Sequence, residues 1–82
     1  MNIYVANISF RAREEQLKEL FQQFGEVSSV KVVTDRETGR SRGFGFVEMP
    51  NDGEGKAAIT QLNGVAFHDR NLVVNEARPP RS

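Results

Sequence analysis

The chain has 82 residues, enough for one compact core and no second domain, and it lacks cysteine, which excludes disulfide bonds, thiolate nucleophiles and cysteine-based zinc sites. Its eleven basic and eleven acidic side chains give a formal net charge of zero, which argues against a protein that holds polyanions by charge alone. The sequence shows neither a charged leader before an apolar run nor a stretch of ~20 apolar residues, so we expect a cytoplasmic protein that does not contact membranes.

The first part of the chain has the pattern of a strand followed by a helix. Residues 2–6 alternate in polarity, which places Ile3 and Val5 on one face and Tyr4 on the other. Residues 13–24 carry apolar side chains at three- and four-residue steps and predict a helix. No Ser, Thr or Asp cap precedes this helix, so we expect its start to fray. Its buried stripe consists of Leu17, Leu20, Phe21 and Phe24.

The middle of the chain predicts two strands joined by a loop. Residues 27–34 are rich in β-branched side chains and predict the second strand. The polar, glycine-containing residues 35–41 predict an exposed loop, and residues 42–49 predict a third strand that ends before Pro50. The two faces of the second strand carry Val30 with Val32 and Lys31 with Val33.

The last part of the chain predicts a second helix and a fourth strand. Residues 52–62 have helical spacing. We expect residues 65–70 to form a short ribbon and residues 71–77 to form the fourth strand. In that strand, Leu72 and Val74 are expected to face inward.

The predicted order is therefore βαββαβ, in which two helices can cover only one face of the sheet. The alternation places Tyr4, Phe44 and Phe46 on the other face. Aromatic rings contribute most when buried, so three exposed rings indicate a surface that a ligand covers. Nucleobases suit such rings, since each stacked base contributes about 1–3 kcal/mol. The alternative is a sheet buried on both sides, and the flanking Arg42 and Glu48 argue against it.

The third and first predicted strands contain two distinctive motifs, the octamer Arg42-Gly43-Phe44-Gly45-Phe46-Val47-Glu48-Met49 and the hexamer Ile3-Tyr4-Val5-Ala6-Asn7-Ile8. Together they resemble the two ribonucleoprotein motifs of the RNA recognition motif family, and the similarity of pattern extends over residues 2–77. The resemblance implies an α+β fold, a ferredoxin-like βαββαβ sandwich whose four-stranded antiparallel sheet has two helices on one face. It also implies one RNA recognition motif over residues 1–78 and a flexible tail at residues 79–82.

The resemblance further implies which side chains bind single-stranded RNA. Tyr4 and Phe44 match the family's two base-stacking aromatics, and Phe46 is expected to pack between successive sugars. Arg42 matches the basic position that contacts a phosphate, a task that its planar donors suit. The strand neighbours and the chain exit that could contact base edges are Lys31, Val33, Val73, Asn75, Glu76, Ala77 and Arg78.

Two positions depart from the family pattern or modify it. Met49 stands where the octamer usually ends in an aromatic, and the alternation turns it into the core, where methionine fills irregular space. Glu48 points outward beside the rings, where its carboxylate would repel phosphate or accept a hydrogen bond from a base.

We expect Gly43 and Gly45 to keep the surface low around the rings. Because the net charge is zero, we also expect modest affinity and a weak dependence on salt.

Other function classes fit the sequence less well. The chain has a single histidine, His68, which is expected at the surface, and no framework surrounds a nucleophile, so we expect neither an enzyme nor a cofactor or metal. A protein-interaction module of the same fold is an alternative, although such members commonly lose the stacking aromatics. Single-stranded DNA binding is a second alternative, because contacts to the 2′-OH cannot be read from sequence. Arg36 and Arg40 fit a solvated loop as well as they fit an RNA contact.

The expected biological setting rests on the resemblance. The chain resembles small bacterial proteins with a single RNA recognition motif, which implies a monomer that acts in post-transcriptional regulation or as an RNA chaperone. A nuclear or organellar origin stays open at this point, as do the preferred RNA sequence and the physiological target.

Overall fold

The structure is a computed structural model that describes residues 1–9, 11–34, 37 and 41–77, without the side chains of residues 34, 41 and 42. Most of the predicted loop at 35–41, Arg78 and the predicted tail at 79–82 lie outside the described residues. The elements in chain order are β1 (Asn2–Ala6), α1 (Glu14–Gln22), β2 (Ser29–Thr34), β3 (Ser41–Glu48), α2 (Asp52–Leu62), β4 (Ala66–Phe67), β5 (Arg70–Asn71) and β6 (Val73–Glu76).

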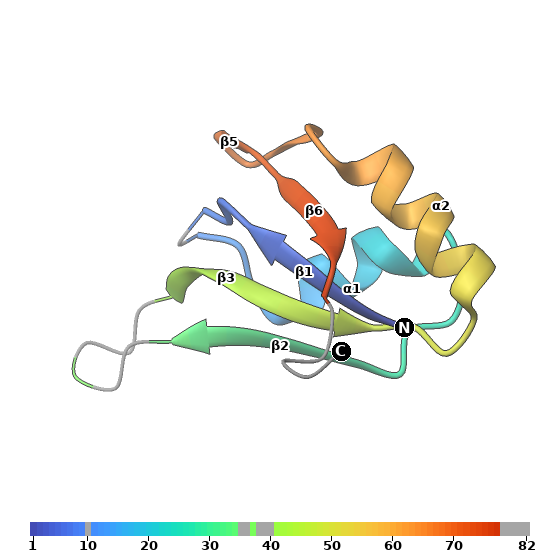
Figure 1. Ribbon diagram of the computed structural model, residues 1–82. Coiled ribbons are helices and arrows are strands. Elements are labelled where there is room, and N and C mark those ends of the chain that lie inside the picture. Colours follow the sequence, from blue (N-terminus) through green and yellow to red (C-terminus); the bar gives the residue numbers. More distant parts are fainter. Residues whose placement is uncertain (10, 35–36, 38–40, 78–82) are drawn as a thin grey trace.

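The main sheet has four strands in the order β2-β3-β1-β6, and every neighbouring pair is antiparallel. Strands β4 and β5 form a separate two-stranded hairpin between α2 and β6 (Figure 1). The two motifs identified in the sequence lie on β1 and β3, which are neighbours in the middle of the sheet. The predicted βαββαβ order and the predicted fold class are confirmed.

One hydrophobic core joins both helices to the same face of the sheet. Apolar side chains from all these layers form a single buried cluster, as the alternation in the strands and the helical spacing require. Its members from β1, α1, β3, α2 and β6 include Ile3, Val5, Leu17, Phe21, Val47, Ala58, Leu62 and Val74. Met49 is also fully buried, as expected from the alternation. Among the described residues, no helix therefore lies over the opposite face of the sheet.

The two helices begin in different ways. The Asn51 side chain caps α2 by accepting a hydrogen bond from the Glu54 amide, with 2.9 Å between Oδ1 and N. At α1, the side-chain oxygen of Gln16 instead accepts a hydrogen bond from the Arg13 amide at 3.1 Å. The α1 helix is slightly shorter than predicted, since it starts one residue after Arg13 and ends at Gln22.

The prediction of a fourth strand over residues 71–77 is wrong at its start. Asn71 pairs with Ala66 in the β4–β5 hairpin, and β6 begins only at Val73. The main chain of Leu72 between them is occupied, because its amide donates to the Val65 carbonyl at 2.9 Å and its carbonyl accepts from Gly64 at 2.7 Å. The expected ribbon is confirmed as this hairpin, and Leu72 and Val74 are both buried as predicted.

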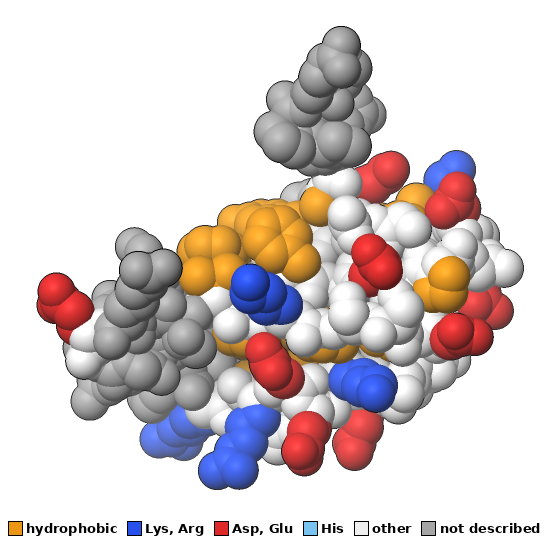
Figure 2. All heavy atoms as spheres, turned by 90° about the horizontal axis from the view of Figure 1, so that it is seen from below, with side chains coloured by type: hydrophobic (Ala, Val, Ile, Leu, Met, Phe, Trp, Pro, Cys, Tyr) orange, Lys and Arg blue, Asp and Glu red, His pale blue; other side chains and the backbone are white. Residues whose placement is uncertain are grey.

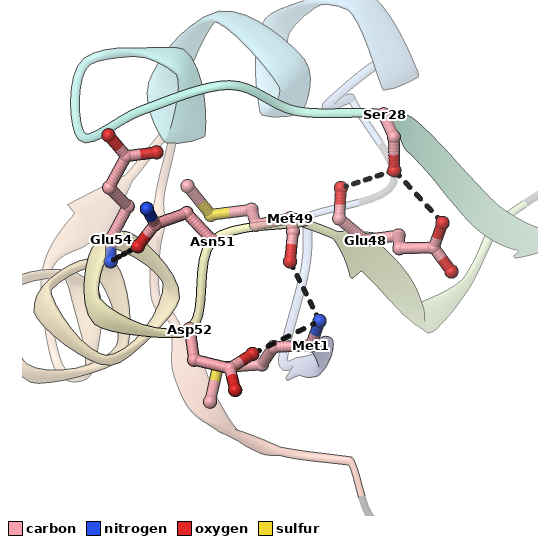
Figure 3. Close-up of polar contacts among 7 residues, drawn as sticks. All are labelled: Met1, Ser28, Glu48, Met49, Asn51, Asp52 and Glu54. Atoms are coloured by element: carbon pink, nitrogen blue, oxygen red, sulfur yellow. Dashed lines mark hydrogen bonds and ion pairs between the residues drawn. The ribbon is translucent and has the colours of Figure 1, made fainter.

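The end of β3 is joined to the first residue of the chain. The Met1 amino group donates to the Met49 carbonyl at 2.7 Å and lies 3.6 Å from the Asp52 carboxylate (Figure 3). The Met49 amide in turn donates to the Met1 carbonyl at 3.0 Å. These contacts extend the pairing of β1 with β3 beyond the last ladder residues.

Candidate nucleic-acid interface

The sheet face away from the helices carries side chains in transverse rows, because the four strands pair in register. In the central row Phe46 is the partner of both Lys31 and Tyr4, and Tyr4 is also the partner of Asn75. The row therefore crosses the whole sheet in the order Lys31, Phe46, Tyr4, Asn75. Alternation along the strands adds a row with Phe44, Ala6 and Val73 on one side and a row with Ser29, Glu48 and Asn2 on the other.

Three aromatic rings form a cluster in the middle of this face. The ring centroid of Tyr4 lies 5.7 Å from that of Phe46 and 6.1 Å from that of Phe44, and the two phenylalanine rings are 6.4 Å apart. The Phe46 side chain is 40% exposed, whereas Tyr4 and Phe44 are half-buried. In Figure 2, exposed hydrophobic side chains gather in one patch of the surface with charged side chains beside it. The alternative in which these rings belong to the core is wrong, since the buried cluster contains none of them.

The expectation that Gly45 keeps the surface low around the rings is wrong. Gly45 pairs with Val5 and Val32, so it faces the core, and it is buried. A Cβ atom at Gly45 would collide with the Lys31 carbonyl oxygen, so glycine here allows β2 to approach β3. Gly43 lies where the β2–β3 register shifts, and its φ of +87° fits a bulge that only glycine adopts easily.

Other predicted contact residues differ in where they lie and in how far the structure describes them. Lys31 and Asn75 are exposed at the two ends of the central row, as expected. The backbone of Arg42 is part of β3, but its side chain and all of Arg78 lie outside the described residues. Glu76 pairs with Ile3 and alternates with the buried Val74, so it belongs to the helix face of the sheet.

The side chain of Glu48 lies at the edge of the ring cluster and is held in place. The Ser28 hydroxyl donates a hydrogen bond to the Glu48 carboxylate, with 2.9 Å between Oγ and Oε1 (Figure 3). The same hydroxyl lies 3.1 Å from the Glu48 carbonyl oxygen, which also accepts the Ser28 amide at 2.8 Å. The carboxylate of Glu48, two residues from Phe46 along β3, therefore has a hydrogen-bond partner in Ser28.

The opposite end of the sheet is bordered by the β4–β5 hairpin, which is tied to the loop after β1 and to the start of α1. The imidazole of His68 contacts the Gln16 side chain, with 3.0 Å between Nε2 and Oε1. The Ser9 hydroxyl, buried in that loop, donates a hydrogen bond to Asp69 and lowers the pKa of the Asp69 carboxyl. A backbone hydrogen bond and the charges of Arg11 and Arg70 lower this pKa further.

Comparison with known proteins assigns the chain to a family. The sequence profile described as "RNA recognition motif" matches residues 3–73. The chain belongs to the RNA recognition motif family. This family consists of RNA-binding domains and is typically non-enzymatic, so the family predicted from the two motifs is confirmed.

Individual relatives agree with this assignment. The protein RbpD of Nostoc sp. is 54% identical over 79 residues, which cover 96% of this chain and 84% of RbpD. The crystal structure of RNA binding protein PG1 superposes with a TM-score of 0.91 at 56% identity, covering 96% of this chain and 98% of PG1. The Sxl-lethal protein/RNA complex has a TM-score of 0.90 at 29% identity, covering 95% of this chain and 47% of that one.

The sequence analysis did not assign Asn2 and Ala6 to the open face of this RNA recognition motif. Asn2 is the partner of Glu48, and Ala6 stands between Phe44 and Val73. The same two-residue alternation that placed Tyr4 outward would have identified both.

In the described part of the chain, no helix is long and apolar enough to cross a membrane.

Proposed function

We propose that this protein binds single-stranded RNA by stacking bases on Tyr4 and Phe44, with a ribose against Phe46. The observation that carries the proposal is the cluster of three rings on the sheet face without helices, with centroids 5.7–6.4 Å apart. Rings in this arrangement remain partly exposed, and 40% of the surface of Phe46 is accessible to solvent. Burying these rings in the core would stabilise the fold more than leaving them exposed. A ligand with flat aromatic faces compensates for that exposure.

Stacking is proposed as the main source of affinity. Two stacked bases would contribute about 2–6 kcal/mol together, at about 1–3 kcal/mol each. The formal net charge of zero favours a small number of phosphate contacts and hence a weak dependence on salt. We assign Arg42 to a phosphate contact and Arg78 to a base contact at the chain exit. The exposed Lys31 and Asn75 are assigned to contacts at the two ends of the central row.

The biological role proposed is post-transcriptional regulation or RNA chaperoning by a cytoplasmic monomer. We assign one RNA recognition motif to residues 1–78. The match of the family profile to residues 3–73 supports the extent of the domain. Support for RNA as the ligand comes from the family itself and from the similarity to a domain named as part of a protein/RNA complex.

The experiment is a titration of fluorescent oligoribonucleotides with wild-type protein, Tyr4→Ala and Phe44→Ala. Each substitution removes one stacking surface and should weaken binding by about 1–3 kcal/mol. The thermal unfolding midpoint should change little, because neither ring belongs to the buried cluster. Equal affinity of wild type and both variants would reject the stacking surface.

Two controls separate the proposal from its alternatives. Phe67→Ala removes a ring of the β4–β5 hairpin that packs against the core, so it should lower stability while leaving the affinity of the folded protein unchanged. The same oligonucleotide in deoxy form tests single-stranded DNA, because only RNA offers the 2′-OH. Equal binding of both forms would contradict selectivity for RNA, and binding of neither form would favour a protein-interaction module.

A further inference from the structure

The acidic side chain of Glu48 lies two residues after the exposed Phe46 on β3. The two residues alternate on β3 with buried Val47 between them, so both face away from the helices. Glu48 is exposed, and its register partners Asn2 and Ser29 are also exposed and polar. A polar row therefore runs along one side of the aromatic cluster.

The position of the Glu48 carboxylate is restrained before any ligand binds. Its Oε1 atom accepts a hydrogen bond from the Ser28 hydroxyl at 2.9 Å, as Figure 3 shows. Ser28 is itself fixed, because its amide donates to the Glu48 carbonyl at 2.8 Å. A side chain that is already ordered loses less conformational entropy when it binds a ligand.

A carboxylate at this place distinguishes between parts of an RNA strand. It repels phosphates, but an ionised carboxylate has about four acceptor positions, of which Ser28 occupies one. The remaining positions can accept N–H donors from the edge of a base that stacks on a neighbouring ring. Residues two apart in a strand are ~7 Å apart, so the flexible Glu48 side chain can reach the edge of a base that stacks on the neighbouring ring.

The four bases differ in how well they satisfy a carboxylate. Guanine presents two adjacent donors, N1–H and the 2-amino group, which match the two carboxylate oxygens. Adenine and cytosine present one amino group beside an unprotonated ring nitrogen, and uracil presents one N–H between two carbonyl oxygens. The other three bases offer a carboxylate one N–H donor at a time on this edge, so guanine alone satisfies both carboxylate oxygens.

We propose that Glu48, positioned by Ser28, is a specificity-determining residue that selects guanine for the base stacked beside it. This inference rests on the proposed function, because it requires bases on the aromatic surface. Glu48 thereby turns a surface of low charge into one that discriminates among sequences. The cost of placing a carboxylate near phosphates is offset only when a donor-rich base occupies the site.

The test uses a short uridine-rich oligoribonucleotide with one guanosine, and the same strand with inosine, adenosine or cytidine at that position. Inosine keeps N1–H and lacks the 2-amino group. The proteins are wild type, Glu48→Gln, Ser28→Ala and the control Glu19→Gln, which makes the same charge change at an exposed position of α1. Dissociation constants are measured at several salt concentrations, and the far-ultraviolet spectrum of each variant confirms folding.

The expected result is a preference of about tenfold or more for guanosine over adenosine or cytidine in the wild type, as hydrogen bonds to a charged group provide. Inosine should bind with intermediate affinity. Glu48→Gln should remove most of the preference and Ser28→Ala part of it, whereas Glu19→Gln should retain it. Tighter binding of all four strands by Glu48→Gln, with a steeper salt dependence, would overturn the inference by showing that Glu48 only repels phosphate.

The same measurements separate failure of the inference from failure of the proposed function. Binding that depends on Phe44 but shows no preference for guanosine would overturn the selection by Glu48 and leave stacking intact. Binding that Phe44→Ala does not weaken would overturn both. A guanosine preference that survives in Glu48→Gln would assign it to other residues and overturn the role of the carboxylate.

Discussion

The side-chain amide of Asn7 donates a hydrogen bond to the main-chain carbonyl of Asn71, with 2.7 Å between Nδ2 and O. The side-chain oxygen of Asn7 accepts a second hydrogen bond from Arg70, 3.2 Å from Nη1. Asn7 thereby ties the end of β1 to β5, next to the row that contains Phe44. Its backbone has a φ of 56°, a left-handed conformation that asparagine tolerates better than most side chains.

Replacement of Asn7 should destabilise the fold in two separable ways. Asn7→Ala loses both hydrogen bonds and puts alanine, which tolerates the left-handed conformation less well than asparagine, at this position, so the free energy of unfolding should fall by about 2–3 kcal/mol. Asn7→Gly loses the same bonds but accepts the backbone conformation, so its loss should be about 1 kcal/mol smaller. Urea unfolding measures both, with Asn2→Ala on the open sheet face as the control. Equal losses in the two variants would show that backbone strain does not contribute.

The lowered pKa of Asp69 predicts that the stability of the fold depends on pH. The Ser9 hydroxyl, the backbone and nearby arginines lower the pKa of the Asp69 carboxyl below its ordinary value of 3.8, so folding favours the ionised form. The stabilisation is therefore complete above the unfolded pKa and is lost as the pH falls through the lowered folded pKa. Asp69→Asn should have a lower unfolding midpoint than wild type at neutral pH, and this difference should shrink once the pH is below 3.8. A difference that stays constant in acid would contradict the role of the charge.

Local sequence patterns predicted most of the fold because most of its elements are determined locally. The alternation in residues 2–6 and the helical spacing in residues 52–62 gave the bounds of β1 and α2 as they stand in the structure. The predicted start of the fourth strand was wrong because the main-chain amide and carbonyl of Leu72 form hydrogen bonds with Val65 and Gly64. That pairing continues the β4–β5 hairpin beyond Ala66 and Asn71, and no periodicity in the sequence records it.

The candidate site was predictable to a similar extent. Alternation placed all three rings on one face, since it depends only on strand geometry. The role of Gly45 was misassigned because its reason is the Lys31 carbonyl on a neighbouring strand, which the octamer itself does not contain. The carboxylate of Glu48 was expected outward, but its hydrogen bond to Ser28 required the register of β2 against β3.

The close approach of β2 at Gly45 gives a test of this packing. In Gly45→Ala the new Cβ would collide with the Lys31 carbonyl, and backbone cannot move aside as a flexible side chain can. The free energy of unfolding should fall by about 3 kcal/mol, the upper part of the range for overpacking. Gly64→Ala is the matched control, because its Cβ would meet no atom within 4 Å and only its φ of +86° is unfavourable. A Gly45→Ala protein as stable as Gly64→Ala would contradict the predicted collision.

The position of Lys31 on the open face predicts that its charge contributes measurably to RNA binding. It is exposed beside Phe46 in the central row, where a strand crossing the rings would bring a phosphate near it. Removing one phosphate contact from a single-stranded ligand should reduce the slope of log K against log salt by about 0.7. Lys31→Gln should therefore bind more weakly at low salt and approach the wild-type affinity as salt rises. Lys18→Gln makes the same change on the exposed side of α1 and should leave the slope unchanged. If both variants alter the slope equally, the effect comes from overall charge, and Lys31 does not contact the strand.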